Sequence, residues 1–335
     1  MNRVFVAIPD GAVKDTFLPP YVREELEKSF SVKYNETGEN LDFDGLTTAL
    51  CDADAVITGW GSPMLDEAVL EKAKKLKLIV HTGGTVGNLV DSSAYDRGIC
   101  VLSGNRLYAE SVAEGTLAYM LTALRRIPDY VNNVREGGWR TEADIWEGLL
   151  DRTVGIVGLG TISIMLIELL QSFRVKIKVY SHYQADPGFL EKNNCESASL
   201  EEIFSTCDIV SVHSALNAEN RGLIRREHFE MLKDGCLFLN TSRGDVIDED
   251  ALIDEFKKGR FRAVLDVFHK EPVAADSPLR TLENVYCIPH MAGPTIDRRP
   301  IITMRLIEQM RKFFGGDRKL ELEITREIAA RMTKM

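Results

Sequence analysis

The 335-residue sequence lacks any apolar run long enough to span a bilayer, and its first residues, Met1-Asn-Arg-Val-Phe-Val, lack the basic and apolar segments of a secretion signal. These absences argue against a membrane protein and favour a cytoplasmic location. The 44% hydrophobic and 27% charged residues are typical of a globular chain with a large core. No internal repeat or low-complexity segment is present, and the length predicts two domains.

The cysteines are few and lie far apart in the sequence. No CxxC motif occurs, and no two histidines stand at metal-ligand spacing. Several cysteines adjoin apolar, strand-like residues, which favours reduced core residues. We therefore expect neither a disulfide nor a metal site. The six cysteines are Cys51, Cys100, Cys195, Cys207, Cys236 and Cys287.

Positive charge is also scarce: the sequence has 41 Lys and Arg residues but 51 Asp and Glu residues, which gives a formal net charge of -10. A protein that binds nucleic acid through phosphate contacts favours the opposite balance. The composition therefore argues against a nucleic-acid partner. It says little about small-molecule ligands.

Short apolar runs alternate with helical patterns through the first hundred or so residues, which is typical of a parallel α/β sheet. Pro19 and Pro20 precede the first predicted helix, a position that proline favours because its fixed φ suits the first helical turn. The predicted strands are 3–8, 31–34, 53–59, 76–82 and 100–103, and the predicted helices are 22–30, 44–51 and 66–75. Together they predict a first small parallel α/β layer.

The same alternation resumes at Thr153 and predicts a doubly wound domain with a second parallel sheet. A capping box, Ser199-Leu-Glu-Glu202, opens one of its helices. The predicted strands are 153–158, 176–180, 208–213, 236–240, 263–268 and 285–288, and the other predicted helices are 162–173, 226–232 and 249–258. A final helix, 297–314, is followed by no further strand and is expected to return to the first domain.

Between the two alternating regions, Ser111-Val-Ala-Glu114 has the form of a capping box ahead of an apolar helix at 117–124. This helix is apolar on most of its circumference, so it is expected to be buried on several sides. We predict that it packs against its copy in a homodimer.

A glycine turn follows the predicted strand at 153–158 and leads directly into a helix, the arrangement that holds a dinucleotide phosphate. Gly158 can take the turn dihedrals, and Gly160 has no Cβ to block a pyrophosphate. The first free N–H groups of the helix, at Thr161 and Ile162, then point at the anion. The turn therefore predicts a dinucleotide site.

Polar clusters follow three predicted strands of the second domain, at the edge where a doubly wound sheet binds ligands. They are Asn240-Thr-Ser-Arg-Gly244, Leu265-Asp-Val-Phe-His-Lys-Glu-Pro272 and Ile288-Pro-His-Met-Ala-Gly293. In this order they resemble the motifs of the D-isomer-specific 2-hydroxyacid dehydrogenases. The loop 82–88, the segment 111–114, the glycine turn and residues 220–224 extend the resemblance over almost the whole chain.

The resemblance implies an α/β fold of two Rossmann-like domains with parallel sheets. One is a flavodoxin-like substrate domain of residues 1–105 and 294–335. The other is a doubly wound NAD(P)-binding domain of residues 106–293, inserted between the two parts of the first. It implies an enzyme that acts on a small 2-hydroxy or 2-keto acid.

By motif match, the resemblance makes Arg243, Glu271 and His290 the catalytic residues. Arg243 would offer a planar fork of donors to the substrate carboxylate and carbonyl oxygen. His290 would take the hydroxyl proton as hydride leaves C2 for the nicotinamide, and return it in the reductive direction. Glu271 would fix the tautomer of His290. Each residue alone is an ordinary loop residue, so the interpretation depends on the ordered set.

Further binding residues follow from the same resemblance. In relatives, backbone N–H groups of a glycine loop hold the substrate carboxylate, which implies this task for Gly83, Gly84 and Thr85, with Asn105 placed nearby. Asp266 resembles the residue that receives the nicotinamide amide. The other implied cofactor contacts, besides the glycine turn, are Ser181, Ser214, Thr241, Ser242 and Gly293.

Ser181 stands where relatives that prefer NAD carry an acid, which would repel the 2'-phosphate of NADP. No Arg or Lys follows at once to bind that phosphate, so NAD and NADP both stay open, with a slight lean to NADP or dual use. Ser163 replaces the third glycine of the turn. Arg174 replaces the glycine that usually ends the helix, and a left-handed Arg there costs about 1 kcal/mol.

Two other functions stay open. The transcriptional corepressors called C-terminal binding proteins share the fold and the three catalytic residues, but the sequence ends soon after its last predicted helix, which disfavours this reading. The second alternative is a protein of the same family that binds the cofactor but no longer catalyses the reaction, which the departures at Ser163 and Ser181 motivate. We expect no separate regulatory domain. The sequence identifies neither the 2-hydroxy acid nor the physiological direction.

Overall fold

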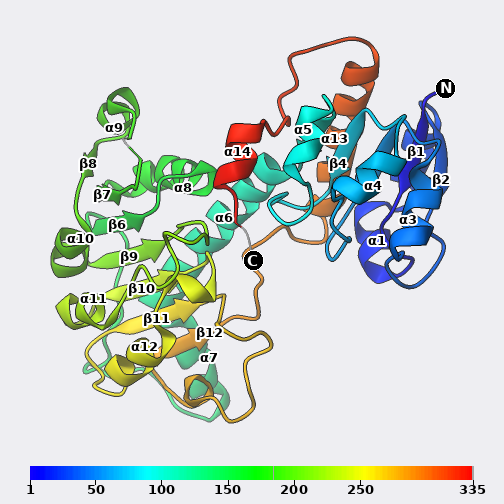
Figure 1. Cartoon of the computed structure of the whole chain (residues 1–335). Helices are drawn as coiled ribbons and strands as arrows, with labels where there is room; N and C mark the ends of the chain where they lie inside the picture. The colour runs from blue at the N-terminus through cyan, green and yellow to red at the C-terminus, as the bar shows by residue number, and fades with distance from the viewer. Residues whose placement is uncertain (184, 334–335) are drawn as a thin grey trace. The chain divides into compact units, whose positions relative to one another are not determined.

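The computed structural model describes residues 1–183 and 185–333 and has two compact units, each built on a parallel sheet (Figure 1). The first unit comprises Met1–Tyr108 and Pro294–Met335, and the second comprises Ala109–Gly293. The predicted α/β fold class with two Rossmann-like sheets is confirmed. Among the described residues, no helix combines the length and the apolar character that a membrane span requires.

The first unit has a five-stranded sheet in the order β2-β1-β3-β4-β5, the order of flavodoxin-like folds. Val4 and Val6 of β1 face one apolar layer and Phe5 faces the other, because alternate residues of a strand point to opposite faces. Helices cover both layers, as a parallel sheet requires. The strands are β1 Arg3–Val6, β2 Ser31–Tyr34, β3 Ala55–Thr58, β4 Leu78–His81 and β5 Cys100–Ser103.

The long helix α13 packs in the first unit, as expected for the last predicted helix, because Leu306 and Met310 join the apolar layer of Val4 and Val6. The short helices α1, α5 and α14 were not predicted, since so few residues carry no clear helical period. The helices are α1 Ala12–Phe17, α2 Pro20–Glu27, α3 Phe43–Leu50, α4 Glu67–Lys72, α5 Ser92–Asp96, α13 Arg298–Phe314 and α14 Arg326–Arg331.

Helix α6, Asn105–Leu124, corrects the predicted capping box at Ser111. The helix begins at Asn105, whose N–H donates to Ser103 Oγ at 3.1 Å. Ser111 lies inside the helix, and its hydroxyl is buried with no partner among the described residues. The prediction that a capping box at Ser111 starts the helix was therefore wrong, because the helix already begins at the polar turn of residues 103–105.

The second unit has a seven-stranded sheet in the order β12-β11-β10-β9-β6-β7-β8. Counted from β6, this is the dinucleotide-binding order 3-2-1-4-5-6 with one more strand at an edge. The strands are β6 Thr153–Val157, β7 Lys176–Tyr180, β8 Cys195–Ser197, β9 Ile209–Val212, β10 Leu237–Asn240, β11 Arg262–Leu265 and β12 Val285–Cys287.

The helices of the second unit include two that were not predicted, α7 and α9, and the short strand β8 was also missed. The predicted cap at Ser199 is confirmed, because its side chain accepts the N–H of Glu202 at 3.1 Å. The helices, besides the part of α6 from Ala109 onward, are α7 Ile127–Arg135, α8 Thr161–Leu170, α9 Pro187–Lys192, α10 Leu200–Thr206, α11 Arg226–Met231 and α12 Glu249–Phe256, with short 3-10 turns at Gln171–Phe173, Gly244–Val246 and Pro278–Arg280.

Arg174 has the left-handed backbone that the sequence predicted, with φ 53° and ψ 31°. Its guanidinium donates to Asp151 from Nε to Oδ1 and from Nη2 to Oδ2, both at 3.0 Å. Both side chains are exposed, so solvent screens the pair and its contribution to stability is small. The pair therefore offsets part of the strain.

The prediction of core cysteines is right for some positions and wrong for others. Cys207 and Cys236 are buried, whereas Cys51 and Cys287 are exposed. Cys51 directly follows the last residue of α3, and Cys287 ends the edge strand β12. Apolar neighbours in sequence therefore did not reveal that these positions lie at element ends, where solvent reaches them.

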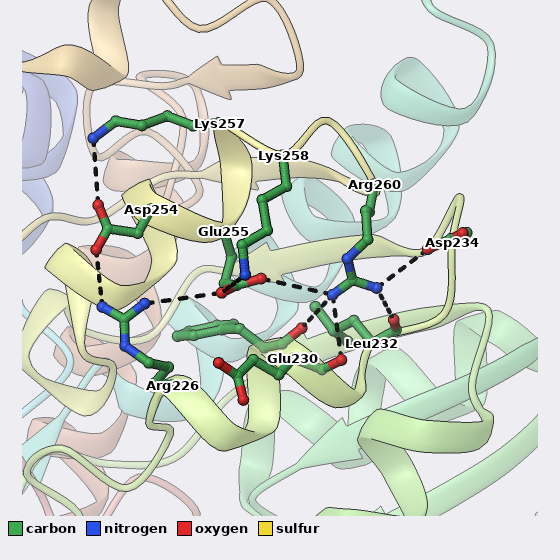
Figure 2. Close-up of polar contacts among 10 residues, drawn as sticks. Arg226, Glu230, Leu232, Asp234, Asp254, Glu255, Lys257, Lys258 and Arg260 are labelled. Atoms are coloured by element: carbon green, nitrogen blue, oxygen red, sulfur yellow. Dashed lines mark hydrogen bonds and ion pairs between the residues drawn. The ribbon is translucent and has the colours of Figure 1, made fainter.

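Glu255 of α12 is fully buried, and basic side chains surround it (Figure 2). Lys258 Nζ lies 2.5 Å from Oε1, Arg226 Nη1 lies 3.8 Å from Oε1 and Arg260 Nη2 lies 3.7 Å from Oε2. A buried carboxylate is tolerated when it is paired in this way. Arg260 also donates to the Leu232 carbonyl at 2.9 Å. The cluster ties α12 to α11 and contains none of the predicted site residues.

Candidate active site

The glycine turn after β6 has the geometry that a dinucleotide phosphate needs. Gly158 has φ 98°, and a Cβ there would lie 2.8 Å from the backbone of Ser214, so only glycine fits. A Cβ on Gly160 would meet nothing within 4 Å, which leaves that side of the turn open. Among the described residues, no acceptor takes the N–H groups of Thr161 and Ile162. These free donors at the start of α8 fit a diphosphate.

Ser163 occupies the third glycine position without disrupting the turn. Its side chain is fully buried, and Oγ donates to the Gly158 carbonyl at 2.5 Å. The hydroxyl therefore binds the first turn of α8 to the glycine turn. The departure from glycine preserves the close packing of helix and strand.

Ser214 and Ser181 lie on either side of the glycine turn, after β9 and β7, and the sheet order places both strands next to β6. Ser214 Oγ donates to the Val157 carbonyl at 3.3 Å, so this side chain supports the turn. Ser181 Oγ accepts the N–H of Tyr183 at 3.3 Å. Sequence reasoning missed Glu219, whose Oε2 lies 3.4 Å from His182 Nε2, because the two residues belong to separate loops.

The predicted catalytic residues come together at the carboxyl ends of three adjacent strands, β10, β11 and β12. His290 Nδ1 donates to Glu271 Oε2 at 2.7 Å, since a carboxylate can only accept. Glu271 Oε1 accepts the N–H of Phe268 at 3.1 Å, which fixes the carboxylate on its own loop. His290 itself has φ 51°, a left-handed conformation that is unusual for a side-chain-bearing residue.

Gly244 brings Arg243 close to the Glu271 loop. A Cβ on Gly244 would lie 2.0 Å from the Phe268 carbonyl carbon, so only glycine allows the two backbones to approach. Arg243 is half-buried, and its Nη1 donates to the Ser242 carbonyl at 2.6 Å. Burial lowers the pKa of Arg243, and the Glu271 carboxylate acts in the opposite direction.

Asp266 holds the loop that follows His290. It is buried, and its two oxygens accept the N–H groups of Met291 at 2.7 Å and Ala292 at 3.0 Å. Tyr119 of α6 donates its hydroxyl to the same carboxylate at 3.2 Å. Burial raises the pKa of Asp266, while these hydrogen bonds lower it. The structure thus gives Asp266 a positioning task that motif matching did not foresee.

The remaining predicted cofactor residues of the second unit lie on the same loops. Thr241 Oγ1 lies 3.2 Å from Thr116 Oγ1 of α6, and both residues are buried. The Ser242 side chain donates to Asn240 Oδ1 at 2.8 Å. A Cβ on Gly293 would meet nothing within 4 Å. Thr241 and Ser242 therefore have protein partners for their side chains, whereas Gly293 is open.

In the first unit, one serine organises the predicted carboxylate loop after β4. Ser103 Oγ lies 3.0 Å from the Gly83 carbonyl oxygen and 2.6 Å from that of Gly84. The same Oγ accepts the N–H of Asn105 at 3.1 Å. Within residues 1–183 and 185–333, no acceptor takes the N–H groups of Gly83, Gly84 and Thr85. The loop therefore presents donors to an anion, and Ser103 is the residue that the sequence did not single out.

Comparison with known proteins supports the same reading of the motifs. A family model described as "D-isomer specific 2-hydroxyacid dehydrogenase, NAD binding domain" matches residues 117–292. A hydroxypyruvate reductase of Thermotoga maritima is 31% identical over 319 residues, which cover 94% of this chain and all of that protein. A D-3-phosphoglycerate dehydrogenase of Methanocaldococcus jannaschii is 32% identical over 84% of this chain.

The chain spans about half the length of the D-3-phosphoglycerate dehydrogenases that it matches, 54% in the archaeal example. Among solved structures, a phosphoglycerate oxidoreductase from Rhizobium etli superposes with a TM-score of 0.79 at 26% identity, over 97% of this chain and 99% of that one. The family model covers more than half of the residues, and a full-length relative exceeds 30% identity. The chain belongs to the D-isomer specific 2-hydroxyacid dehydrogenase family, as the motifs predicted.

Proposed function

We propose that the chain is an oxidoreductase that transfers a hydride between NAD(P) and C2 of a D-2-hydroxy acid or 2-keto acid. The observation that carries the proposal is the 2.7 Å pair of His290 and Glu271, at the strand ends that also present Arg243. The phosphate turn at Gly158 belongs to the same sheet, and ligands of such sheets bind at the carboxyl ends of the strands. Family membership supports the same reaction class.

In this reaction His290 acts as the general acid and base. Glu271 accepts a hydrogen bond from Nδ1, which keeps its proton. Nε2 is therefore the atom that takes the substrate hydroxyl proton and returns it in the reductive direction. Arg243 stays protonated at neutral pH and binds the substrate carboxylate and carbonyl oxygen. The nicotinamide, when bound, accepts or supplies the hydride.

We assign substrate binding to the first unit and cofactor binding to the second, with boundaries near residues 105 and 293. The free N–H groups of Gly83, Gly84 and Thr85 support a carboxylate site, and Ser103, which contacts that loop, also accepts the backbone N–H of Asn105. In the second unit, the glycine turn would hold the diphosphate. Ser181, Ser214, Thr241, Ser242, Asp266 and Gly293 remain the proposed further contacts with the dinucleotide.

The cofactor is NAD or NADP, with the slight lean to NADP or dual use that Ser181 motivates. The decisive test is to titrate the protein with NADH and NADPH and to follow absorbance at 340 nm after adding glyoxylate, hydroxypyruvate, pyruvate and phenylpyruvate. We expect oxidation of at least one dinucleotide. Tight dinucleotide binding without oxidation across a broad 2-keto acid panel would instead favour a regulatory, corepressor-like protein or a relative without turnover.

We also propose a homodimer through an apolar surface of the second unit. Ile127, Val131 and Val134 lie on one face of α7 and are 42–53% exposed. The loop that follows adds Trp139, 73% exposed, and Ile145, 70% exposed. Large exposed apolar patches of this kind mark interaction surfaces. This surface lies on α7 and its loop, which follow α6 in the chain, and the sequence predicts the dimer through α6.

The dimer has a direct test. Light scattering at micromolar protein is expected to give about twice the mass of one chain, and Val131→Asp, which places a charge in the centre of the patch, is expected to give monomers. Thr122→Asp on α6, outside this patch, serves as the control. A monomeric mass for the unaltered chain at this concentration would refute the dimer.

A further inference from the structure

Among the described residues, one arginine of the first unit, Arg299, has no acidic partner. Arg299, in the first turn of α13, places its guanidinium carbon 4.8 Å from the ring centre of Trp60 and 5.6 Å from that of Phe17. Its Nη1 donates to Thr16 Oγ1 at 3.1 Å and its Nε to the Pro294 carbonyl at 3.3 Å. These contacts fix the direction of the side chain and leave the other Nη atom, Nη2, without a partner among the described residues.

The lack of an acidic partner sets Arg299 apart from other arginines of its own helix. Arg305 pairs with Glu308 at 2.9 Å, and Arg311 pairs with Glu25 at 2.5 Å. Within the described part of the chain, no carboxylate oxygen lies within 4 Å of the Arg299 guanidinium, although Asp and Glu outnumber Lys and Arg by 51 to 41. A half-buried cation without a counter-ion can accept an anion from solution.

The aromatic rings beside Arg299 connect it to the proposed carboxylate loop. Trp60 follows β3, and its ring centre lies 6.3 Å from that of Tyr108 in an edge-to-face arrangement. The Tyr108 ring in turn packs on Gly84, where a Cβ would lie 3.5 Å from Cδ1. Arg299, Trp60, Tyr108 and Gly84 therefore form a continuous row, all of it within the first unit.

Tyr108 adds a second open polar group to this row. Its hydroxyl is buried and has no hydrogen-bond partner among the described residues, and burial raises its pKa. The Arg299 cation and the nearby Trp60 indole act in the opposite direction and lower that pKa. Buried hydroxyls are normally paired, so this one has a donor to offer to a ligand oxygen.

We propose that Arg299, with Tyr108, binds a second anionic group of the substrate, a carboxylate or a phosphate several atoms from C1. The inference rests on the proposed function, because it places the C1 carboxylate at the loop of Gly83 to Thr85. The two anionic groups then bind to opposite ends of the aromatic row. Trp60, which is 41% exposed, packs against the carbon chain between them. The preferred substrates are 2-keto acids with a distal negative charge.

The experiment compares dianionic and monoanionic 2-keto acids in the unaltered enzyme and in Arg299→Gln. The dianions are 3-phosphohydroxypyruvate and 2-oxoglutarate, and the monoanions are hydroxypyruvate and 2-oxobutanoate. In the unaltered enzyme, at least one dianion is expected to exceed both monoanions in kcat/KM by tenfold or more. Which dianion it is separates a phosphate from a carboxylate as the distal group.

Arg299→Gln is expected to lower kcat/KM for the preferred dianion by about 10- to 100-fold, the scale of a hydrogen bond to a charged group. The loss should fall on KM, because Arg299 does not contact the reacting atoms. The monoanions should change by less than about threefold. Arg299→Lys, which keeps the charge without the planar fork, should recover part of the loss. Arg305→Gln on the same helix is the matched control.

Several results would overturn the inference. Equal losses for dianions and monoanions in Arg299→Gln, or a fall in its melting temperature well beyond that of Arg305→Gln, would show a structural role only. No dianion preference in an enzyme that reduces hydroxypyruvate would also overturn it while leaving the proposed function intact. Calorimetric binding of the preferred dianion, in the unaltered chain and in Arg299→Gln, tests the same subsite without turnover, and equal affinities would refute it.

Discussion

Replacing His290 by asparagine is expected to lower kcat by roughly two to four decades, the usual scale of general acid-base catalysis. An amide cannot take up the substrate proton. The imidazole can, because its Nδ1 donates to Glu271 Oε2, 2.7 Å away, and its Nε2 is left for the substrate. Dinucleotide affinity should be unchanged, since none of the contacts of His290 involves the glycine turn. Steady-state kinetics and the dissociation constant of the dinucleotide measure the two effects separately.

His269 offers a matched control for this experiment. It lies on the same loop as Glu271, but its Nε2 donates to the Ile247 carbonyl at 2.8 Å rather than to a proposed catalytic residue. His269→Asn should therefore keep kcat within a few-fold of the parent. If His290→Asn retained the parent activity, His290 would have no part in the proton transfer, and the proposed mechanism would be wrong.

Acidification from pH 7.5 to pH 5 is expected to destabilise both units, because each contains a histidine whose pKa is lowered by burial of its ring nitrogens. His81 at the end of β4 is 6% exposed, and burial lowers its pKa to about 4. His213 after β9 has a buried Nδ1 with no partner among the described residues, and burial lowers its pKa to about 4 as well. An unfolded histidine has a pKa of about 6.5.

The sign follows from the protons bound in each state. Between pH 6.5 and pH 4 the unfolded chain binds more protons, so the stability that these residues contribute is complete above pH 6.5 and is lost as the pH falls toward 4. Each histidine accounts for roughly 3 kcal/mol over that interval, at about 1.4 kcal/mol for each unit of pKa difference. Urea unfolding at several pH values, followed by circular dichroism, measures the slope.

Variants separate the two histidines. His81→Gln and His213→Gln should each lower the stability at pH 7.5 and flatten its dependence on pH, because the titrating group is gone. His182→Gln, at an exposed position, should leave that dependence unchanged. If the variant with both His81 and His213 replaced kept the full slope of the parent, the pH dependence would originate elsewhere, for instance in the paired carboxylates.

Most of the fold was predictable because the signals that encode it are local. The strand at 176–180 and the strand at 31–34 were predicted with the bounds that the structure shows. The turn at Gly158 was predictable because a positive φ and a close backbone approach require glycine wherever they occur. The local patterns failed at Ser111, where the helix had already begun, and at Cys287, which ends an edge strand.

The site divides in the same way. The order of the polar motifs around Arg243, Glu271 and His290 identified the family, and parallel strands necessarily bring their carboxyl ends to one edge. The contact of Gly244 with Phe268, the support of the His290 loop by Asp266, and the position of Glu219 beside His182 could not be read from spacing. Each joins segments that no local pattern relates.

The sequence by itself determined the fold class and the family and suggested the residues that carry the chemistry, because periodicity, glycine positions and motif order are properties of neighbouring residues. Only the tertiary structure decided which of those residues support others and which stay open to a ligand. Asp266 is held by three protein donors, whereas Arg299 has no carboxylate partner within the described part of the chain. That difference depends on packing between distant segments, which sets burial and hydrogen-bond partners one contact at a time.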